Sequence, residues 1–270
     1  MSELKKYFLE LENYSTKWEK YFDVYENLLS KYKNKNIIFV EIGIFNGGSL
    51  KLWKKYFGEN SKIIGIDINE KCKQFEDKEN NIEVFIGNQS DEKFWFNFFD
   101  KVGNVDVILD DGGHTNLDQI VTTINTIPYI NDNGALIIED THTSYLKNYN
   151  SNLNYSFVNF TKNLIDDLNS NIDLNLHLKK NNNSKKIIYS IEYFESIVVF
   201  KINRKKAFKN YPIKNNGAFH SIEDLSERGN EIFIGKIKRF LSKIPFIRLN
   251  KLTKFIKNKI NNNKIKKFFK

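Results

Sequence analysis

Hydrophobic residues in the stretch 36–140 fall into short runs separated by longer amphipathic stretches. Apolar runs of strand length stand at 37–42, 62–67, 82–86, 105–110 and 135–139. Stretches with helical spacing lie between them, at 49–57, 91–100 and 117–127. Short, nearly continuous apolar runs are typical of strands buried on both faces of a parallel sheet. The alternation predicts an α/β fold with a doubly wound, mostly parallel, Rossmann-like sheet.

The pattern changes after residue 140. A helix is predicted at 157–168, and two strands at 186–193 and 196–203 are close enough to form an antiparallel hairpin. A doubly wound sheet that ends in such a hairpin resembles the class I methyltransferases.

Residues 3–34 have helical spacing and predict an N-terminal helical segment. The sequence Thr16-Lys17-Trp18-Glu19 fits a helix capping box, and apolar residues at helical spacing follow it. A packing helix is the favoured interpretation of this segment, and a lid over the active site is the alternative.

Charge divides the chain into a body and a tail. The 270 residues carry a net charge of +9, but residues 231–270 hold 13 Lys or Arg and one acid. Residues 1–230 therefore hold 29 basic and 32 acidic residues, a net charge of −3. The positive charge that would suggest a nucleic-acid-binding protein thus belongs to the tail.

Apolar residues recur at helical spacing in this tail. They stand at Ile237, Phe240, Leu241 and Ile244, and a second stripe follows Pro245. A basic amphipathic helix of this kind binds an anionic membrane surface. Packing on the body, or on a second subunit of a homo-oligomer, is an equal alternative. No RNA-binding module is visible, so nucleic acid is not expected as a partner.

Compartment signals in the sequence are few. The single cysteine excludes an internal disulfide framework and a cysteine-based zinc site. No apolar run approaches the ~20 residues that span a bilayer, and the N-terminus lacks a signal-peptide pattern. We expect a cytoplasmic protein, peripheral to the inner membrane if the tail binds lipid.

Glycine and polar residues follow the first predicted strands, where ligands of open α/β sheets bind. A glycine-rich turn after the first strand allows a ligand close to the backbone. Asp67 ends the second strand, where an acid can accept hydrogen bonds from ribose hydroxyls but would repel the 2′-phosphate of NADP. NAD and S-adenosylmethionine both remain open on these residues alone. The candidate cofactor-binding residues are Glu41, Gly43, Asn46, Gly47, Ser49, Asp67, Asn88, Gln89, Ser90 and Asp110.

Acids and two of the four histidines follow the fourth and fifth strands. The fourth strand ends in Asp110-Asp111-Gly112-Gly113-His114, and the fifth in Glu139-Asp140-Thr141-His142. Carboxylates that converge at neighbouring strand ends repel one another unless a cation lies between them. Oxygen ligands select hard cations such as Mg²⁺. The pattern predicts a divalent-metal site, and the alternative is that these acids cap helices and face water.

These segments resemble the metal-dependent sugar O-methyltransferases of macrolide biosynthesis, the mycinamicin and macrocin type. That family carries an Asp-Asp-Gly-(Ser/Gly)-His motif and a later Ile-Glu-Asp motif followed by Thr-Ser-Tyr. The motifs stand here at 110–114, 138–140 and 143–145. The resemblance covers roughly Thr16 to Phe200 and does not continue through the basic tail.

The resemblance implies a methyl donor, a metal and roles for individual residues. The donor would be S-adenosylmethionine, and Asp111, Glu139 and Asp140 would bind Mg²⁺. His114 would be the general base, and His142 is the rival base.

The resemblance also implies the acceptor class, and the sequence pattern and charge together predict the domain organisation. Tyr145 and Asp118 are candidate contacts to the acceptor, a sugar or sugar nucleotide of the kind used for surface polysaccharide. We expect an N-terminal helical extension at 1–35, a methyltransferase domain at 36–203 and a basic tail at 204–270.

Two other functions remain open at this stage. A related fold group includes proteins named cephalosporin hydroxylases, which suggests an oxidative enzyme. An oxygen-activating iron site would prefer two histidines and one carboxylate, whereas this site is rich in carboxylates. A non-catalytic, membrane-associated binding protein is the second alternative.

Overall fold

The computed structural model describes residues 1–149, 153–169, 187–207, 210–218 and 220. The predicted tail helices and the asparagine-rich segments at 181–183 and 261–263 lie outside the described residues. Within the described residues, no helix is long and apolar enough to cross a membrane.

A seven-stranded sheet forms the centre of the described chain, in the order β3-β2-β1-β4-β5-β7-β6. β1 to β5 run parallel, while β7 pairs antiparallel with both β5 and β6. This confirms the predicted doubly wound sheet and its terminal hairpin. The strands are β1 (Ile38–Ile42), β2 (Lys62–Asp67), β3 (Ile82–Ile86), β4 (Val105–Asp110), β5 (Ile130–Ile138), β6 (Ile188–Phe194) and β7 (Ile197–Ile202).

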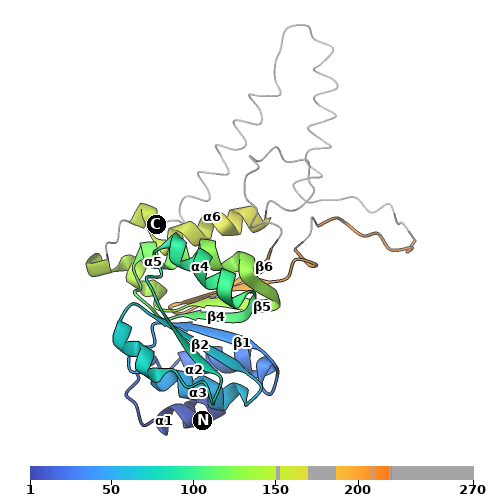
Figure 1. Cartoon of the computed structure of the whole chain (residues 1–270). Helices are drawn as coiled ribbons and strands as arrows, with labels where there is room; N and C mark the ends of the chain where they lie inside the picture. Colours follow the sequence, from blue (N-terminus) through green and yellow to red (C-terminus); the bar gives the residue numbers. More distant parts are fainter. Residues whose placement is uncertain (150–152, 170–186, 208–209, 219, 221–270) are drawn as a thin grey trace. The chain divides into compact units, whose positions relative to one another are not determined.

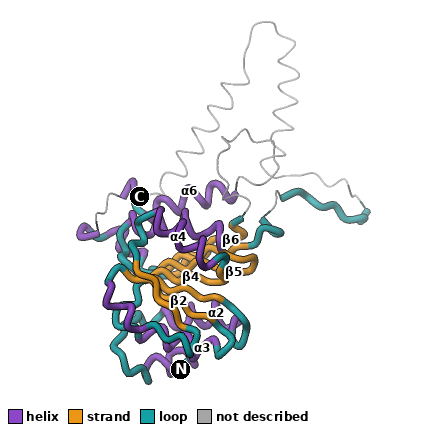
Figure 2. Tube along the Cα trace, viewed as in Figure 1, coloured by secondary structure: helices purple, strands orange, loops and turns teal. Residues whose placement is uncertain are grey.

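Helices cover both faces of the sheet (Figures 1 and 2). One face packs against α1, α2 and α3, and the other against α4, α5 and α6. The helices are α1 (Glu3–Leu9), α2 (Tyr21–Leu29), α3 (Gly48–Phe57), α4 (Glu92–Val102), α5 (Asn116–Thr126) and α6 (Phe157–Asn169).

Alternate residues of each central strand enter opposite cores. Phe39 of β1 packs with Trp53 of α3 in one core, while its neighbour Val40 packs with Trp95 of α4 in the other. All four side chains are at most 1% exposed. Because both faces of the strand are buried, the strand reads as a continuous apolar run, which is why its position was predictable.

The N-terminal segment differs from the prediction. Two helices, α1 and α2, replace one helical stretch, and residues 10–20 between them are non-helical. The capping-box interpretation was wrong: the N-cap position of α2 is Lys20, which makes no side-chain capping bond. The Thr16 hydroxyl instead donates to the Tyr14 hydroxyl (2.9 Å). The segment departs from the helix because Lys17 and Trp18 bind acids at the ends of β4 and β5.

β5 is longer than predicted and begins at Ile130. The residues that follow Ile130 are polar, so the hydrophobic pattern did not extend to the start of the strand. Tertiary contacts hold them in place: Asn131 Nδ2 donates to Asp106 (2.9 Å), and the Arg204 guanidinium donates to Asp132 (3.0 Å).

Glu41 is a buried acid in the central strand β1. Its side chain is fully shielded from solvent. The Ser49 hydroxyl donates to Glu41 Oε2 (2.6 Å), whereas Oε1 has no hydrogen-bond partner among the described residues. Burial raises the pKa of this carboxyl to about 7, although the charge of Lys17 opposes the shift. Between pH 4.5 and 7 the folded protein therefore holds a proton here that the unfolded chain releases.

The buried Glu41 carboxyl makes stability depend on pH. Between pH 4.5 and 7 the folded state binds the proton more tightly, so raising the pH favours unfolding. The shift corresponds to a loss of roughly 3 kcal/mol above pH 7. Glu41→Gln removes this titration, so we expect it to stabilise the protein at pH 8 and to have little effect at pH 4.5. Urea unfolding at both pH values measures the difference, with the exposed Glu59→Gln as control. Equal effects at the two pH values would contradict the assignment.

Candidate active site

The carboxyl ends of β1 to β4 meet around a cavity of about 330 Å³. Six of the predicted site residues line this cavity: Gly43, Asp67, Asn88, Gln89, Asp111 and Asp118. The loop after β4 supplies another wall through Asp111, Gly112 and Gly113. A cavity of this size at the carboxyl edge of a doubly wound sheet is suited to a small cofactor.

Gly43 brings the loops after β1 and β4 into contact. Its backbone φ is +84°, and a Cβ atom at this position would lie 2.1 Å from the carbonyl oxygen of Asp111. Any side chain would push the two loops apart, so glycine is required here for two independent reasons.

Asp67 connects the loops after β1 and β2. Its Oδ2 accepts hydrogen bonds from the backbone N–H groups of Ile44 and Phe45, each at 3.1 Å. Oδ1 accepts one from the N–H of Asn69 (2.9 Å). A carboxylate offers about four acceptor positions, so Asp67 is fixed in orientation and still has capacity for a ribose hydroxyl at the cavity wall.

Gln89 and Asp110 form a buried pair between β3 and β4. Gln89 Nε2 donates to both oxygens of Asp110, each at 3.0 Å, and its Oε1 accepts from the Gly113 N–H (2.8 Å). Burial raises the pKa of Asp110 to about 6, against the hydrogen bond from Gln89. Asp110 is thus positioned to hold the β4 loop in place.

Several predicted cofactor residues lie away from the cavity wall. Glu41 and Ser49 are paired inside the core. The Asn46 carbonyl accepts from Asn13 Nδ2 (2.8 Å), and Ser90 donates to Asn88 Oδ1 within its own turn. Gly47, at a φ of +69°, packs against Phe75.

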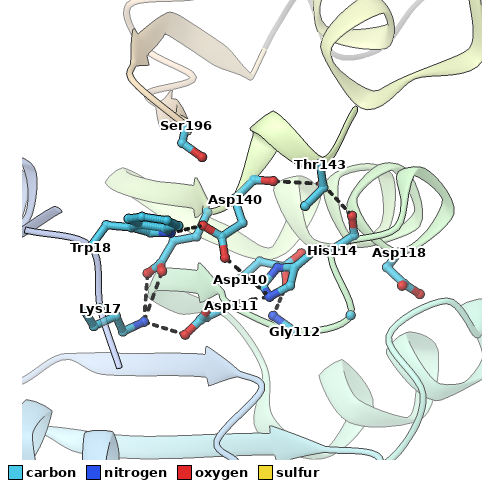
Figure 3. A network of polar contacts seen from close by, with 12 residues as sticks. Lys17, Trp18, Asp110, Asp111, Gly112, His114, Asp118, Asp140, Thr143 and Ser196 are labelled. Atoms are coloured by element: carbon cyan, nitrogen blue, oxygen red, sulfur yellow. Dashed lines mark hydrogen bonds and ion pairs between the residues drawn. The ribbon is translucent and has the colours of Figure 1, made fainter. Parts of the chain in front are cut away.

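The three predicted metal ligands receive hydrogen bonds from one N-terminal segment, and Figure 3 shows those to Asp111 and Asp140. Lys17 Nζ lies 2.6 Å from Asp111 Oδ2 and 3.1 Å from both oxygens of Glu139. Trp18 Nε1 donates to Asp140 Oδ1 (3.0 Å). Sequence reasoning missed Lys17 and Trp18 as site residues, although it considered a lid in this region.

Two tyrosines of α2 add further donors. The Tyr21 hydroxyl donates to Asp140 Oδ1 (2.6 Å), and the Tyr25 hydroxyl donates to Glu139 Oε1. Their spacing in the sequence is also that of a packing helix, so no signal in the sequence separates the two roles.

Burial and charge act against each other at this cluster. Burial alone would lower the pKa of the Lys17 ammonium, but the charges of Asp111 and Glu139 outweigh it and raise that pKa. Burial and the Asp111 charge raise the pKa of Glu139, while Lys17 and Tyr25 oppose the shift. Lys17 is therefore a charged ammonium inside the protein.

Two histidines flank Asp140. His114 Nε2 lies 3.6 Å from Asp140 Oδ2 and 3.8 Å from Asp111 Oδ1. His142 Nδ1 lies 3.9 Å from Asp140 Oδ1 and hydrogen-bonds to the Ser196 hydroxyl. His114 thus lies close to both Asp111 and Asp140, whereas His142 lies close to Asp140.

Two residues of the site have a strained backbone. His114 and Asp140 have φ values of +55° and +54°, in the left-handed region. The Thr143 hydroxyl lies 2.8 Å from the carbonyl oxygens of both residues and bridges the two loops (Figure 3). Strained residues persist only where surrounding contacts hold them, and they are frequent at functional sites.

The donor set suits a hard divalent cation. One ligand atom from each of Asp111, His114 and Asp140 can be chosen so that the three lie within 4.8 Å of one another. Two carboxylates with open space beside them are what Mg²⁺ usually takes from a protein. Glu139, the third predicted ligand, is 1% exposed and accepts from Lys17 and Tyr25.

Of the two predicted acceptor contacts, Asp118 lines the cavity and Tyr145 does not. Tyr145 is 61% exposed beyond the β5 loop. Asp118 lines the cavity but also accepts from the Thr115 hydroxyl (2.6 Å) in a capping box at the start of α5. Asp118 therefore has a structural role in addition to any contact with a ligand.

Known proteins resemble this chain in sequence over about half of its length. No family model matches it. It is 30% identical over 173 residues to 8-demethyl-8-alpha-L-rhamnosyl tetracenomycin-C 2'-O-methyltransferase of Streptomyces olivaceus, covering 59% of this chain and 44% of the relative. It is 30% identical over 129 residues to demethylmacrocin O-methyltransferase of Streptomyces fradiae, covering 45% of this chain and 31% of the relative. The chain thus spans less than half the length of these relatives.

A solved structure has a similar fold. The MycE methyltransferase from the mycinamycin biosynthetic pathway, in complex with Mg and SAH, superposes with a TM-score of 0.68 at 20% identity. The match covers 86% of this chain and 59% of that protein. The chain therefore has the class I S-adenosylmethionine methyltransferase fold and is distantly related to the macrolide-sugar O-methyltransferases.

Proposed function

We propose that this protein is a Mg²⁺-dependent O-methyltransferase that transfers the methyl group of S-adenosylmethionine to a hydroxyl of a sugar or sugar-like acceptor. One observation carries the proposal. Asp111 lines the cofactor-sized cavity and also belongs to the group of Asp111, His114 and Asp140. Donor and acceptor would therefore meet on the two sides of a single loop.

The cavity supports binding of the methyl donor. Asp67 would accept hydrogen bonds from the ribose, and the glycines at 43, 112 and 113 allow the ligand close to the backbone at their part of the cavity wall. Phe45 and Ile68 also line the cavity and are each 69% exposed, which leaves apolar surface for the adenine. The solved structure of MycE holds SAH with Mg.

Asp111 and Asp140 would hold Mg²⁺ through Asp111 Oδ1 and Asp140 Oδ2, which face His114. When bound, the cation supplies Lewis-acid polarisation that lowers the pKa of an acceptor hydroxyl. The two carboxylates fix where that hydroxyl lies relative to the donor cavity, and such positioning accounts for much of the rate in a methyl transfer.

His114 is the proposed general base. Its imidazole would take the hydroxyl proton at Nε2, and the neighbouring carboxylates of Asp111 and Asp140 would stabilise the imidazolium that results. The left-handed backbone and the contact of its carbonyl with Thr143 fix the position of the ring. His142 already hydrogen-bonds to Ser196 through Nδ1 and would orient Asp140.

Two exposed aromatic side chains, one of which contacts Asp140, suit a sugar acceptor. Trp18 and Tyr145 are 60% and 61% exposed. Aromatic faces pack against the C–H faces of sugar rings, and the relatives' names specify glycosylated acceptors. We propose a sugar hydroxyl, on a sugar nucleotide or a surface-polysaccharide precursor, as the acceptor class.

The site does not favour an oxygen-activating iron enzyme. Among the described residues, the candidate ligand group contains two carboxylates and one histidine. Iron sites of that kind prefer two histidines and one carboxylate.

We propose residues 36–203 as the catalytic domain, with residues 1–35 as an extension that reaches its site. The membrane or subunit role of residues 204–270 stays a prediction.

Calorimetry with S-adenosylhomocysteine tests the donor site. We expect one molecule to bind per chain with or without Mg²⁺, because the cavity residues are formed by β1 to β4. Asp67→Asn should weaken binding at least tenfold, since an amide nitrogen replaces a ribose acceptor. Glu70→Gln, which alters an exposed acid three residues away, is the matched control. Absence of binding to the unaltered protein in both conditions would refute the methyltransferase proposal.

Methyl-transfer assays with a panel of sugar nucleotides and glycosides test the base. His114→Asn should lower kcat at least 100-fold, in line with the loss of a general base, while the Kd of S-adenosylhomocysteine stays unchanged. His142→Asn should lower kcat less than tenfold. Equal losses for the two variants would mean that His114 is not the base.

A further inference from the structure

Lys17 is a buried cation within a site that is proposed to bind another cation. Its side chain is 3% exposed, and its Nζ forms ion pairs with Asp111 (2.6 Å) and Glu139 (3.1 Å). Buried lysines are rare unless they are paired, and an unpaired charge in the interior is strongly destabilising. The neighbouring Lys20 shows the contrast, since its pair with Glu195 is more than 70% exposed.

The contacts divide the carboxylate oxygens into an inner and an outer set. The inner set is Asp111 Oδ2 and both oxygens of Glu139, which face Lys17, and Tyr25 adds a donor to Glu139. The outer set is Asp111 Oδ1 and Asp140 Oδ2, which face His114. Asp140 Oδ1 is occupied by Trp18 and Tyr21.

Glu139 has little capacity left for a metal. Its oxygens accept three hydrogen bonds from the protein, and its side chain is 1% exposed. A divalent ion at Glu139 would also have to sit beside the Lys17 ammonium, where like charges repel. The outer oxygens of Asp111 and Asp140 face His114 and accept none of the hydrogen bonds from Lys17, Trp18, Tyr21 or Tyr25. Asp111 thus uses one oxygen for Lys17 and keeps the other available for a metal.

We infer that Lys17 is a positioning residue that serves as the permanent cation of this cluster. It pairs with Glu139 and the inner oxygen of Asp111, so that the divalent ion is held by Asp111 and Asp140 and Glu139 is not a ligand. The inference rests on the proposed function in one respect, that a divalent cation binds here. It assigns to the N-terminal segment the task of orienting a site built by β4 and β5.

Binding of Mn²⁺ to a charge-conserving double variant tests the ligand assignment. Lys17→Met with Glu139→Gln removes one positive and one negative charge and leaves the outer oxygens intact. We expect its Mn²⁺ Kd, measured by electron paramagnetic resonance, to stay within fivefold of the unaltered protein. Asp140→Asn should raise that Kd at least 30-fold. A double variant that binds as weakly as Asp140→Asn would overturn the inference, because Glu139 would then be a ligand.

Thermal unfolding in chelator tests the pairing without any metal. Lys17→Met and Glu139→Gln should each lower Tm, since each leaves a buried partner unpaired, and the double variant should recover most of the loss. Mg²⁺ should raise the Tm of Lys17→Met more than that of the unaltered protein, because an ion can then approach Glu139. Lys20→Met, the exposed control, should change neither value. Additive losses in the double variant would overturn the pairing, and the double variant remains informative if Lys17→Met does not fold.

Failure of this inference is distinguishable from failure of the proposed function. A protein that binds S-adenosylhomocysteine and Mn²⁺, but whose double variant loses Mn²⁺, contradicts only the role of Lys17. An unaltered protein that binds no Mn²⁺ contradicts the metal-dependent function and the ligand assignment, while the unfolding cycle still decides whether Lys17 and Glu139 pair.

Discussion

The loops after β1 and β4 touch at Gly43, and the site depends on that contact. No side chain fits between Gly43 and the Asp111 carbonyl, so the backbones of the two loops are in direct contact. The cavity lies on one side of Asp111, and its carboxylate faces Lys17 and His114 on the other. A displacement of this contact would therefore move the donor cavity and the acid cluster together. Proximity between two bound reactants is thus built into the sheet, rather than into a mobile loop.

The sequence predicts the features that neighbouring residues determine, but not those that depend on contacts between residues far apart in the chain. β2, β3 and β4 match their predicted bounds. Strands that are buried on both faces have continuous apolar sequences, so their positions can be recognised from neighbouring residues alone. The acids at 110–111 and 139–140 were found because parallel strands deliver their carboxyl ends to one edge. Lys17 was missed because its partners are 94 and 122 residues away. The capping-box pattern at Thr16 is a local preference, and these remote ion pairs override it.

The loops after β4 and β5 contain strained backbone that hydrogen bonds from other parts of the chain hold in place. Left-handed backbone at His114 and Asp140 is unfavourable for residues with side chains. Thr143 contacts both carbonyls, while Trp18 and Tyr21 bind the Asp140 side chain. The contacts come from two distant parts of the chain, the β5 loop and the N-terminal segment. The position of His114 relative to the acids is consequently a property of the whole domain, and the motif residues alone do not fix it.

The charge of the site also bears on the acceptor. Residues 1–230 carry a net charge of −3, and the buried Lys17 ammonium pairs with only two of the three carboxylates at the site. An anionic group placed at the acids would be repelled unless cations intervened, whereas a neutral sugar hydroxyl would not. A sugar-nucleotide acceptor would therefore bind with its hydroxyl at the acids and its diphosphate directed away from Asp140, and the exposed side chains of Trp18 and Tyr145 would be available to its ring. The exposed position of both aromatic side chains leaves room for that orientation, so the electrostatics select the sugar end of such a molecule for reaction.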